Sequence, residues 1–86
     1  MLSLEASELF ADYSLDFVYI DAAHNYYNVM LDMRAWWPKV RPGGVLAGHD
    51  YQHMPVRQAV LNFARNMHVA VYSTGEGVCS WFIYKL

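Results

Sequence analysis

The sequence predicts a small α/β domain, and three observations carry this prediction. Two short apolar runs, residues 15–20 and 45–48, are each followed by polar side chains and then by a segment with helical periodicity. The first run has a single charge near its start, which is typical of a parallel strand buried on both faces. Two β-rich runs close the chain, and a length of 86 residues corresponds to one domain.

The first half of the chain is expected to form two helices and two strands, separated by short segments without regular structure. A helix is expected over residues 3–11, with Ser3 as its N-cap, followed by the strand at 15–20. The next helix, from about residue 25 to 37, has large side chains at steps of four, three and four, namely Tyr26, Met30, Met33 and Trp37. Pro38 and a Pro42-Gly43-Gly44 turn are expected to end this unit before the strand at 45–48.

The second half predicts one helix and a hairpin. Pro55 suits the first turn of a helix, and its apolar stripe consists of Val56, Val60, Phe63 and Met67. Residues 68–73 and 78–84 are β-rich and are joined by a Thr-Gly-Glu-Gly loop. The expected order is therefore α-β-α-β-α-β-β.

Composition limits the classes of protein to which the chain can belong. The formal net charge is −2, without a basic patch, so nucleic acid is not an expected partner. No apolar stretch has the length of a membrane span, and the acidic N-terminus does not resemble a signal peptide, so we expect a cytoplasmic protein. Cys79 is the single cysteine and is expected to be buried. The hydrophobic share of 56% predicts either an unusually aromatic core or an apolar surface that another chain covers.

Polar side chains follow both predicted parallel strands. Asp21 and His24 come after the first strand, and His49 and Asp50 come after the second. Ligand chemistry in open α/β sheets gathers at the carboxyl ends of the strands, so these four side chains are candidates for one site. A structural interpretation stays open, because Asp21 and Asp50 could each cap the following helix. The other two histidines have no partner in this pattern and are expected at the surface.

The segments FVYIDAAHNYY and VRPGGVLAGHDY resemble the C-terminal half of class I S-adenosylmethionine-dependent methyltransferases, in particular the small-molecule type that includes catechol O-methyltransferase. The resemblance implies half of a Rossmann-like methyltransferase fold, with a mostly parallel four-stranded sheet whose last strand is antiparallel. The strands would lie in the spatial order one, two, four, three. Residues 1–86 would form a single truncated domain without the N-terminal glycine-rich half that binds the cofactor.

The resemblance also implies roles for individual residues. Asp21 stands where the family has a carboxylate that binds cofactor and metal, and His49 and Asp50 stand at the other metal ligands. His24 stands where a basic side chain takes the proton of the substrate's hydroxyl group. Catechol-type enzymes have a carboxylate at the position of His49, and imidazole suits zinc, iron or manganese better than magnesium.

Two functions follow as expectations. The first is a methyltransferase-like domain, derived from an S-adenosylmethionine-dependent and metal-dependent O-methyltransferase for small molecules, that is not active by itself. The second is a non-catalytic module that associates with itself or binds a ligand or another protein. We also expect a homodimer or higher even oligomer built on the edge of the strand at 15–20 and its flanking helices, because an apolar strand edge tends to pair with another chain.

Overall fold

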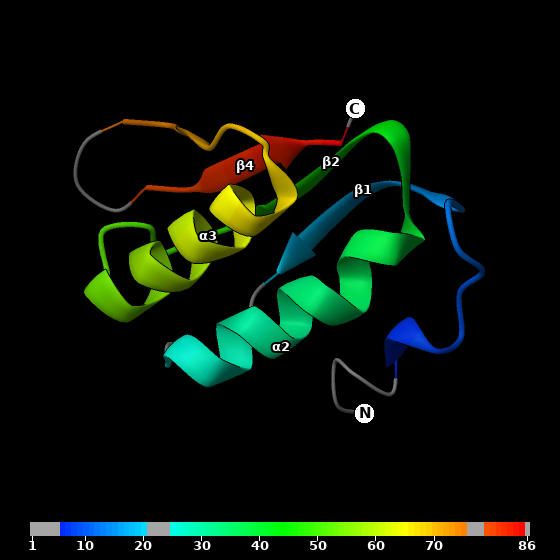
Figure 1. The fold of residues 1–86 in the computed structure, drawn as a ribbon, viewed down its shortest axis with the longest axis horizontal. Helices are drawn as coiled ribbons and strands as arrows, with labels where there is room; N and C mark the ends of the chain where they lie inside the picture. The colour runs from blue at the N-terminus through cyan, green and yellow to red at the C-terminus, as the bar shows by residue number, and fades with distance from the viewer. Residues whose placement is uncertain (1–5, 21–24, 76–78, 86) are drawn as a thin grey trace.

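The computed structural model describes residues 6–20, 25–75 and 79–85. One layer is a four-stranded sheet and the other is a pair of helices that lie side by side across one of its faces (Figure 1). The elements are β1 (Leu15–Ile20), α2 (Tyr26–Trp36), the 3-10 helix η1 (Trp37–Lys39), β2 (Val40–Gly48), α3 (Met54–Met67), β3 (Tyr72–Ser73) and β4 (Trp81–Tyr84). Ala6 and Ser7 are also helical, within the first helix that the sequence predicts.

The sheet has the strand order β1-β2-β4-β3, which confirms the predicted order. β1 and β2 are parallel, and β4 runs antiparallel to both of its neighbours, β2 and β3. A two-stranded parallel unit is therefore extended by an antiparallel hairpin. The two hairpin strands are shorter than the β-rich runs predicted for them.

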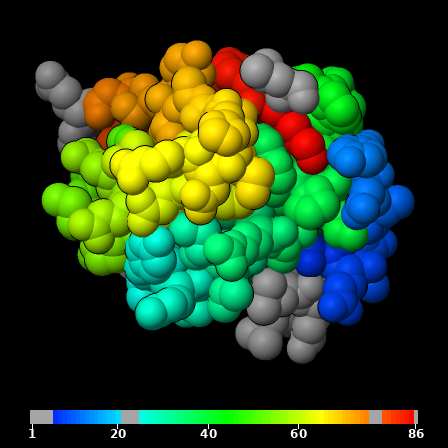
Figure 2. Space-filling view, viewed as in Figure 1, coloured from blue at the N-terminus to red at the C-terminus, as the bar shows by residue number. Residues whose placement is uncertain are grey.

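α3 buries most of the apolar stripe that the sequence predicts for it. The stripe predicted for the first long helix is buried only at Met30 and Met33, whereas Tyr26 and Trp37 at its ends are half-buried. In α2 the side chains of Val29, Met30 and Met33 are buried. In α3 the buried set is Val56, Ala59, Val60, Phe63 and Ala64, whereas Met67 at the end of the stripe is exposed. These side chains form one core with Val18 and Ile20 of β1, Leu46 of β2, and Trp81 and Ile83 of β4. Figure 2 shows the outer side chains of α2 and α3 closing over this face of the molecule.

The turn predicted at Pro42-Gly43-Gly44 lies inside β2, which begins at Val40 rather than Val45. Leu15 of β1 pairs with Val40, and Phe17 pairs with Val45. The residues of β2 between Val40 and Val45 therefore bulge out of the parallel register. Gly43 has φ +88°, and a Cβ at Gly44 would lie 2.8 Å from the backbone oxygen of Asp16. The glycines therefore allow a bulge where the sequence suggests a turn.

The prediction that the first strand is buried on both faces is wrong for this chain. Val18 and Ile20 face the helices and are buried, but Phe17 is 58% exposed and Tyr19 is 46% exposed. The physical reason is that α2 and α3 both lie on the same face of the sheet (Figure 1). The opposite face carries large apolar side chains that no described element covers.

Other expectations concern single side chains. Trp36 and Trp37 are partly buried, against Phe10 and Phe63 respectively, so they belong to the packing of this chain. Cys79 is buried, as predicted, and His53 and His68 are exposed, as predicted. Among the described residues, no helix has the length and apolar character needed to cross a membrane.

Candidate functional site

A histidine and an aspartate lie together directly after β2. The Nδ1 atom of His49 is 2.7 Å from Oδ2 of Asp50, and the two side chains are only 28% and 15% exposed. A carboxylate on Nδ1 fixes the orientation and tautomer of an imidazole and turns Nε2 away from the pair. The arrangement can therefore present one imidazole nitrogen, held in a defined direction, at the carboxyl end of the sheet.

The second carboxylate oxygen of Asp50 is also bonded. Gln52 donates from Nε2 to Oδ1 of Asp50 over 3.2 Å, and its own Oε1 accepts from the backbone N–H of Cys79 over 3.1 Å. Tyr51 donates its backbone N–H to the carbonyl oxygen of Cys79. The loop after β2 is thereby fastened to the segment that leads into β4, which fixes the position of Asp50.

Tyr19, near the end of β1, supports the other side of the histidine. Its ring is stacked against the imidazole of His49, with centroids 6.1 Å apart and planes 10° from parallel. The hydroxyl group of Tyr19 is 3.0 Å from Oγ of Ser80, just before β4. Three strands therefore contribute to one site, with His49 between a carboxylate and an aromatic ring.

The capping alternatives can be compared with this geometry. The N-cap of α2 is Asn25, whose side chain accepts from the backbone N–H of Asn28 over 2.8 Å. The N-cap of α3 is His53, which makes no side-chain capping bond. Asp50 is therefore not the cap of α3, and its carboxylate is engaged by His49 and Gln52.

Two of the four predicted site residues, Asp21 and His24, lie outside the described residues. Within the described part of the chain, no three His, Cys, Asp or Glu side chains are grouped so that they could hold a metal ion. A metal-bound histidine commonly donates its second ring nitrogen to a carboxylate. In the described residues Asp50 contacts Nδ1 of His49, as a carboxylate does when it supports a metal-binding imidazole. Asp21 lies outside the described residues, so the predicted metal site of Asp21, His49 and Asp50 stays a prediction.

Sequence reasoning did not single out Tyr19 or Gln52. In the sequence Tyr19 is one member of an apolar run, and Gln52 carries no local signal. Ser80 lies in the β-rich run at 78–84, and nothing in that run marks it as a site residue. Their contacts span many residues along the chain, 61 between Tyr19 and Ser80 and 27 between Gln52 and Cys79, so only the folded chain brings them to the site.

Comparisons with known proteins agree with this architecture. A crystal structure of a Corynebacterium glutamicum protein superposes with a TM-score of 0.78 at 17% sequence identity, covering 99% of this chain and 45% of that one. This chain therefore spans less than half the length of that protein. No curated protein matches the sequence.

A family model described as a methyltransferase domain matches residues 2–51, which include β1, α2, β2 and the His49–Asp50 pair. The match covers more than half of the 86 residues and ends at the proposed site. The half-Rossmann sheet, its antiparallel last strand and this match lead to one conclusion: the chain belongs to the methyltransferase-domain family.

Proposed function

We propose that this chain carries one part of an S-adenosylmethionine-dependent O-methyltransferase acting on small molecules. It is the part that binds the methyl acceptor, which is a small molecule with a hydroxyl group. The observation that supports the proposal most strongly is the His49–Asp50 pair at the carboxyl end of β2. Transfer of a methyl group to oxygen requires loss of the hydroxyl proton, and a neutral imidazole can accept that proton near neutral pH.

His49 is suited to this task by its surroundings. Asp50 lies on Nδ1, which directs Nε2 away from the carboxylate and toward the space beyond the carboxyl ends of the strands. An imidazolium formed there would be stabilised by the adjacent carboxylate. Tyr19 keeps the ring plane fixed by stacking against it. The family resemblance assigns removal of this proton to His24, so His24 and His49 are alternative proton acceptors in this proposal.

S-adenosylmethionine would supply the methyl group as an electrophile in such a reaction. The five glycines of this sequence lie at positions 43, 44, 48, 75 and 77, and none forms a glycine-rich loop between a strand and a helix. We therefore propose that the 86 residues do not turn over the cofactor by themselves. A second function is the non-catalytic binding module, which the uncovered apolar face of the sheet supports.

A titration with catechol, used as a probe hydroxyl acceptor, tests the acceptor site. Imidazole NMR signals of His49, assigned with His49→Gln, should shift on titration, and Asp50→Asn should weaken the response. Signals of the exposed His68, assigned with His68→Gln, serve as the control. Unchanged His49 signals at millimolar catechol would contradict the proposed acceptor site.

A further inference from the structure

Two consecutive residues before β4, Cys79 and Ser80, are bonded to both supports of His49. The buried Cys79 donates its backbone N–H to Oε1 of Gln52 over 3.1 Å. Oγ of Ser80 lies 3.0 Å from the hydroxyl group of Tyr19. Gln52 belongs to the loop that carries the carboxylate of the site, and Tyr19 supplies the stacked ring. One dipeptide, called the anchor below, therefore holds the surroundings of the imidazole on two sides.

The anchor is itself held against neighbouring segments. Thr74 donates its backbone N–H to the carbonyl oxygen of Ser80 over 3.0 Å, and Ser80 donates its own N–H to Oγ1 of Thr74 over 2.9 Å. The carbonyl oxygen of Cys79 accepts from the backbone N–H of Tyr51 over 3.0 Å. All backbone polar groups of the anchor are thus bonded, which limits its movement. The anchor lies beyond residues 2–51, so the family match gives it no role.

The first support runs from the anchor through Gln52 to Asp50. The backbone N–H of Cys79 can only donate, so it fixes the amide oxygen of Gln52 on its own side. The amide NH2 group of Gln52 then points to Asp50 and donates to Oδ1 over 3.2 Å. With Oδ1 occupied in this way, Oδ2 is the oxygen that lies 2.7 Å from Nδ1 of His49. Gln52 therefore determines how the carboxylate faces the imidazole.

The second support runs from the anchor through Tyr19 to the imidazole ring. The hydroxyl group of a tyrosine lies on the long axis of its ring, so the bond to Ser80 fixes the direction in which the ring projects. The ring of Tyr19 is stacked on that of His49, with the two planes 10° apart. Tyr19 is 46% exposed, so packing alone holds it less firmly than a core ring. Ser80 therefore determines where the stacking ring lies.

We propose that Gln52 and Ser80 are positioning residues for His49, which act from the anchor through Asp50 and Tyr19. Gln52 aligns the carboxylate and thereby favours the neutral tautomer that carries its hydrogen on Nδ1. Ser80 holds the stacking ring and thereby the direction of the imidazole. This role rests on the proposed function, because Nε2 can accept a proton from a hydroxyl group only in the tautomer with hydrogen on Nδ1.

A purely structural role for Gln52 and Ser80 predicts a different result. Their bonds would then only fasten the loop after β2 and the end of β1 to the closing hairpin. Variants would melt at a lower temperature, but the imidazole of the folded molecules would be unchanged. A positioning role predicts a change at His49 in protein that is still folded.

NMR of the 86-residue chain without any acceptor tests the role of Gln52. At a pH of about 9, where an ordinary imidazole is uncharged, the two ring ¹⁵N shifts of His49 report the ratio of its neutral tautomers. Gln52→Met keeps the length of the side chain but deletes both bonds. The ratio of the Nδ1–H to the Nε2–H tautomer should fall by about threefold or more. Asp50→Gly, which deletes the carboxylate, gives the ratio for an imidazole without this support.

Nuclear Overhauser contacts between the rings of Tyr19 and His49 test the role of Ser80. These contacts should weaken by about twofold or more in Ser80→Ala, because the ring of Tyr19 loses its bonded end. Ser80→Thr keeps a hydroxyl group at the same position and should retain the contacts. Tyr19→Phe removes the other partner of the same bond and should match Ser80→Ala.

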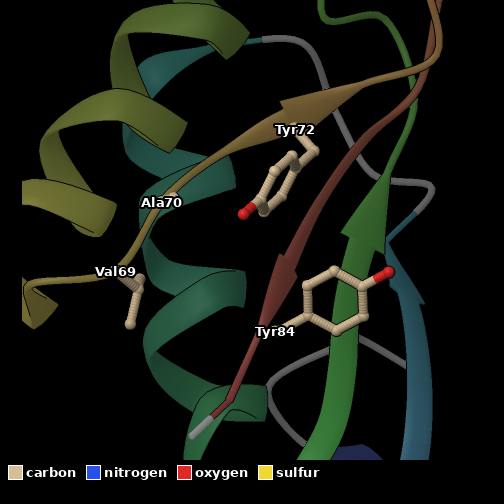
Figure 3. A pocket seen from close by; sticks show the side chains of 4 residues that line it. All are labelled: Val69, Ala70, Tyr72 and Tyr84. Atoms are coloured by element: carbon tan, nitrogen blue, oxygen red, sulfur yellow. The ribbon is translucent and has the colours of Figure 1, made fainter.

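Tyr84→Phe is the matched control for the loss of a tyrosine hydroxyl group. Tyr84 is 48% exposed, close to the value for Tyr19. It pairs with Val45, whereas β2 continues to Gly48 before His49 follows. Its ring lies beside a hollow whose other lining residues are Val69, Ala70 and Tyr72 (Figure 3). Both NMR signatures of His49 should keep their wild-type values in this variant.

The outcomes separate this role from the proposed function. Circular dichroism melts identify the variants that fold. An unchanged tautomer ratio in folded Gln52→Met, or unchanged ring contacts in folded Ser80→Ala, would overturn the positioning role even if catechol still shifts the signals of His49. If both signatures change as expected and catechol leaves His49 unaffected, the positioning role holds and the proposed acceptor site fails.

Discussion

Gly48 lies where the indole of Trp81 crosses β2. A Cβ at this position would lie 2.6–2.8 Å from three atoms of that ring, closer than non-bonded atoms allow. Trp81 is 1% exposed and is one of the largest side chains in the core. The absence of a side chain at Gly48 is therefore what allows the indole to be buried against the strand that leads to His49.

Gly48→Ala should lower the free energy of unfolding by about 1–3 kcal/mol, as overpacking of a core does. In a Trp81→Leu background the same substitution should cost much less, because the conflicting ring is gone. Urea unfolding of the four proteins of this cycle measures the coupling. Equal costs in both backgrounds would show that the close approach to Trp81 is not the cause.

Lys85 gives a prediction about pH. Burial lowers its pKa below the usual 10.5, and the nearby Asp12 carboxylate opposes this only in part. The ammonium group donates to the carbonyl oxygen of Trp37 over 2.7 Å and lies 4.8 Å from the ring centre of Tyr13. Because the unfolded chain holds this proton more tightly, Lys85 makes the free energy of unfolding rise with pH between its lowered pKa and 10.5.

Denaturant unfolding at a series of alkaline pH values checks this contribution. Lys85→Met should lose that part of the slope, whereas Lys39→Met, which also removes one positive charge, should keep it. A slope unaffected by Lys85→Met would mean that another group is responsible.

At the scale of the elements, local signals predict the helices well. α2 begins directly after Asn25, whose side chain accepts from the backbone N–H of Asn28. Asn25→Ala should therefore cost about 1 kcal/mol, and the melting temperature should fall by about 4–8 °C for a domain of this size. Asn28→Ala removes the same kind of side chain without removing the capping acceptor and should leave the melting temperature nearly unchanged.

The limits of each element were harder to predict where distant residues set them. β1 has the predicted bounds, because its apolar run ends at polar residues. The sequence places the start of β2 at Val45 instead of Val40, since Gly43 and Gly44 signal a turn locally. In the folded chain both are paired with Lys85 of the C-terminal segment through backbone hydrogen bonds, and no local pattern reveals that pairing.

The sequence predicts where the candidate site lies, but it identifies only some of the residues that form it. His49 and Asp50 follow a strand and were found for that reason. Tyr19 and Gln52 reach the site through contacts that only the fold creates. Asp21 and His24 remain predictions, as they lie outside the described residues.

For the whole molecule, the sheet order follows from the family resemblance. The composition allows for an apolar surface, but the sequence does not show that this surface is the face of the sheet that α2 and α3 leave uncovered. Phe17 and Tyr19 are large, uncharged and largely hydrophobic side chains beside Val18 and Ile20, so the sequence of β1 alone is that of a strand covered on both sides. Which side is covered depends on where α2 and α3 pack. Both lie on one face, and this single fact separates a core strand from a surface strand.

Calorimetric titration with S-adenosylmethionine tests the molecule as a unit. We expect no binding at micromolar affinity, because the sequence has no glycine-rich loop to hold the cofactor. Titration of a known S-adenosylmethionine-binding methyltransferase under the same conditions serves as the positive control. Stoichiometric micromolar binding by this chain would instead indicate a cofactor site built from other residues.

The backbone of Asp50 is in the left-handed region, with φ +63°. This conformation disfavours most side chains, by about 1–2 kcal/mol for an ordinary L-residue, and glycine adopts it freely. Asp50→Gly and Asp50→Val both delete the carboxylate, yet the glycine variant should melt well above the valine variant. If Asp50→Gly also melts no lower than the wild type, thermal stability alone does not favour aspartate at this position. Selection would then have kept a residue that is costly to the fold for the sake of the imidazole that it orients.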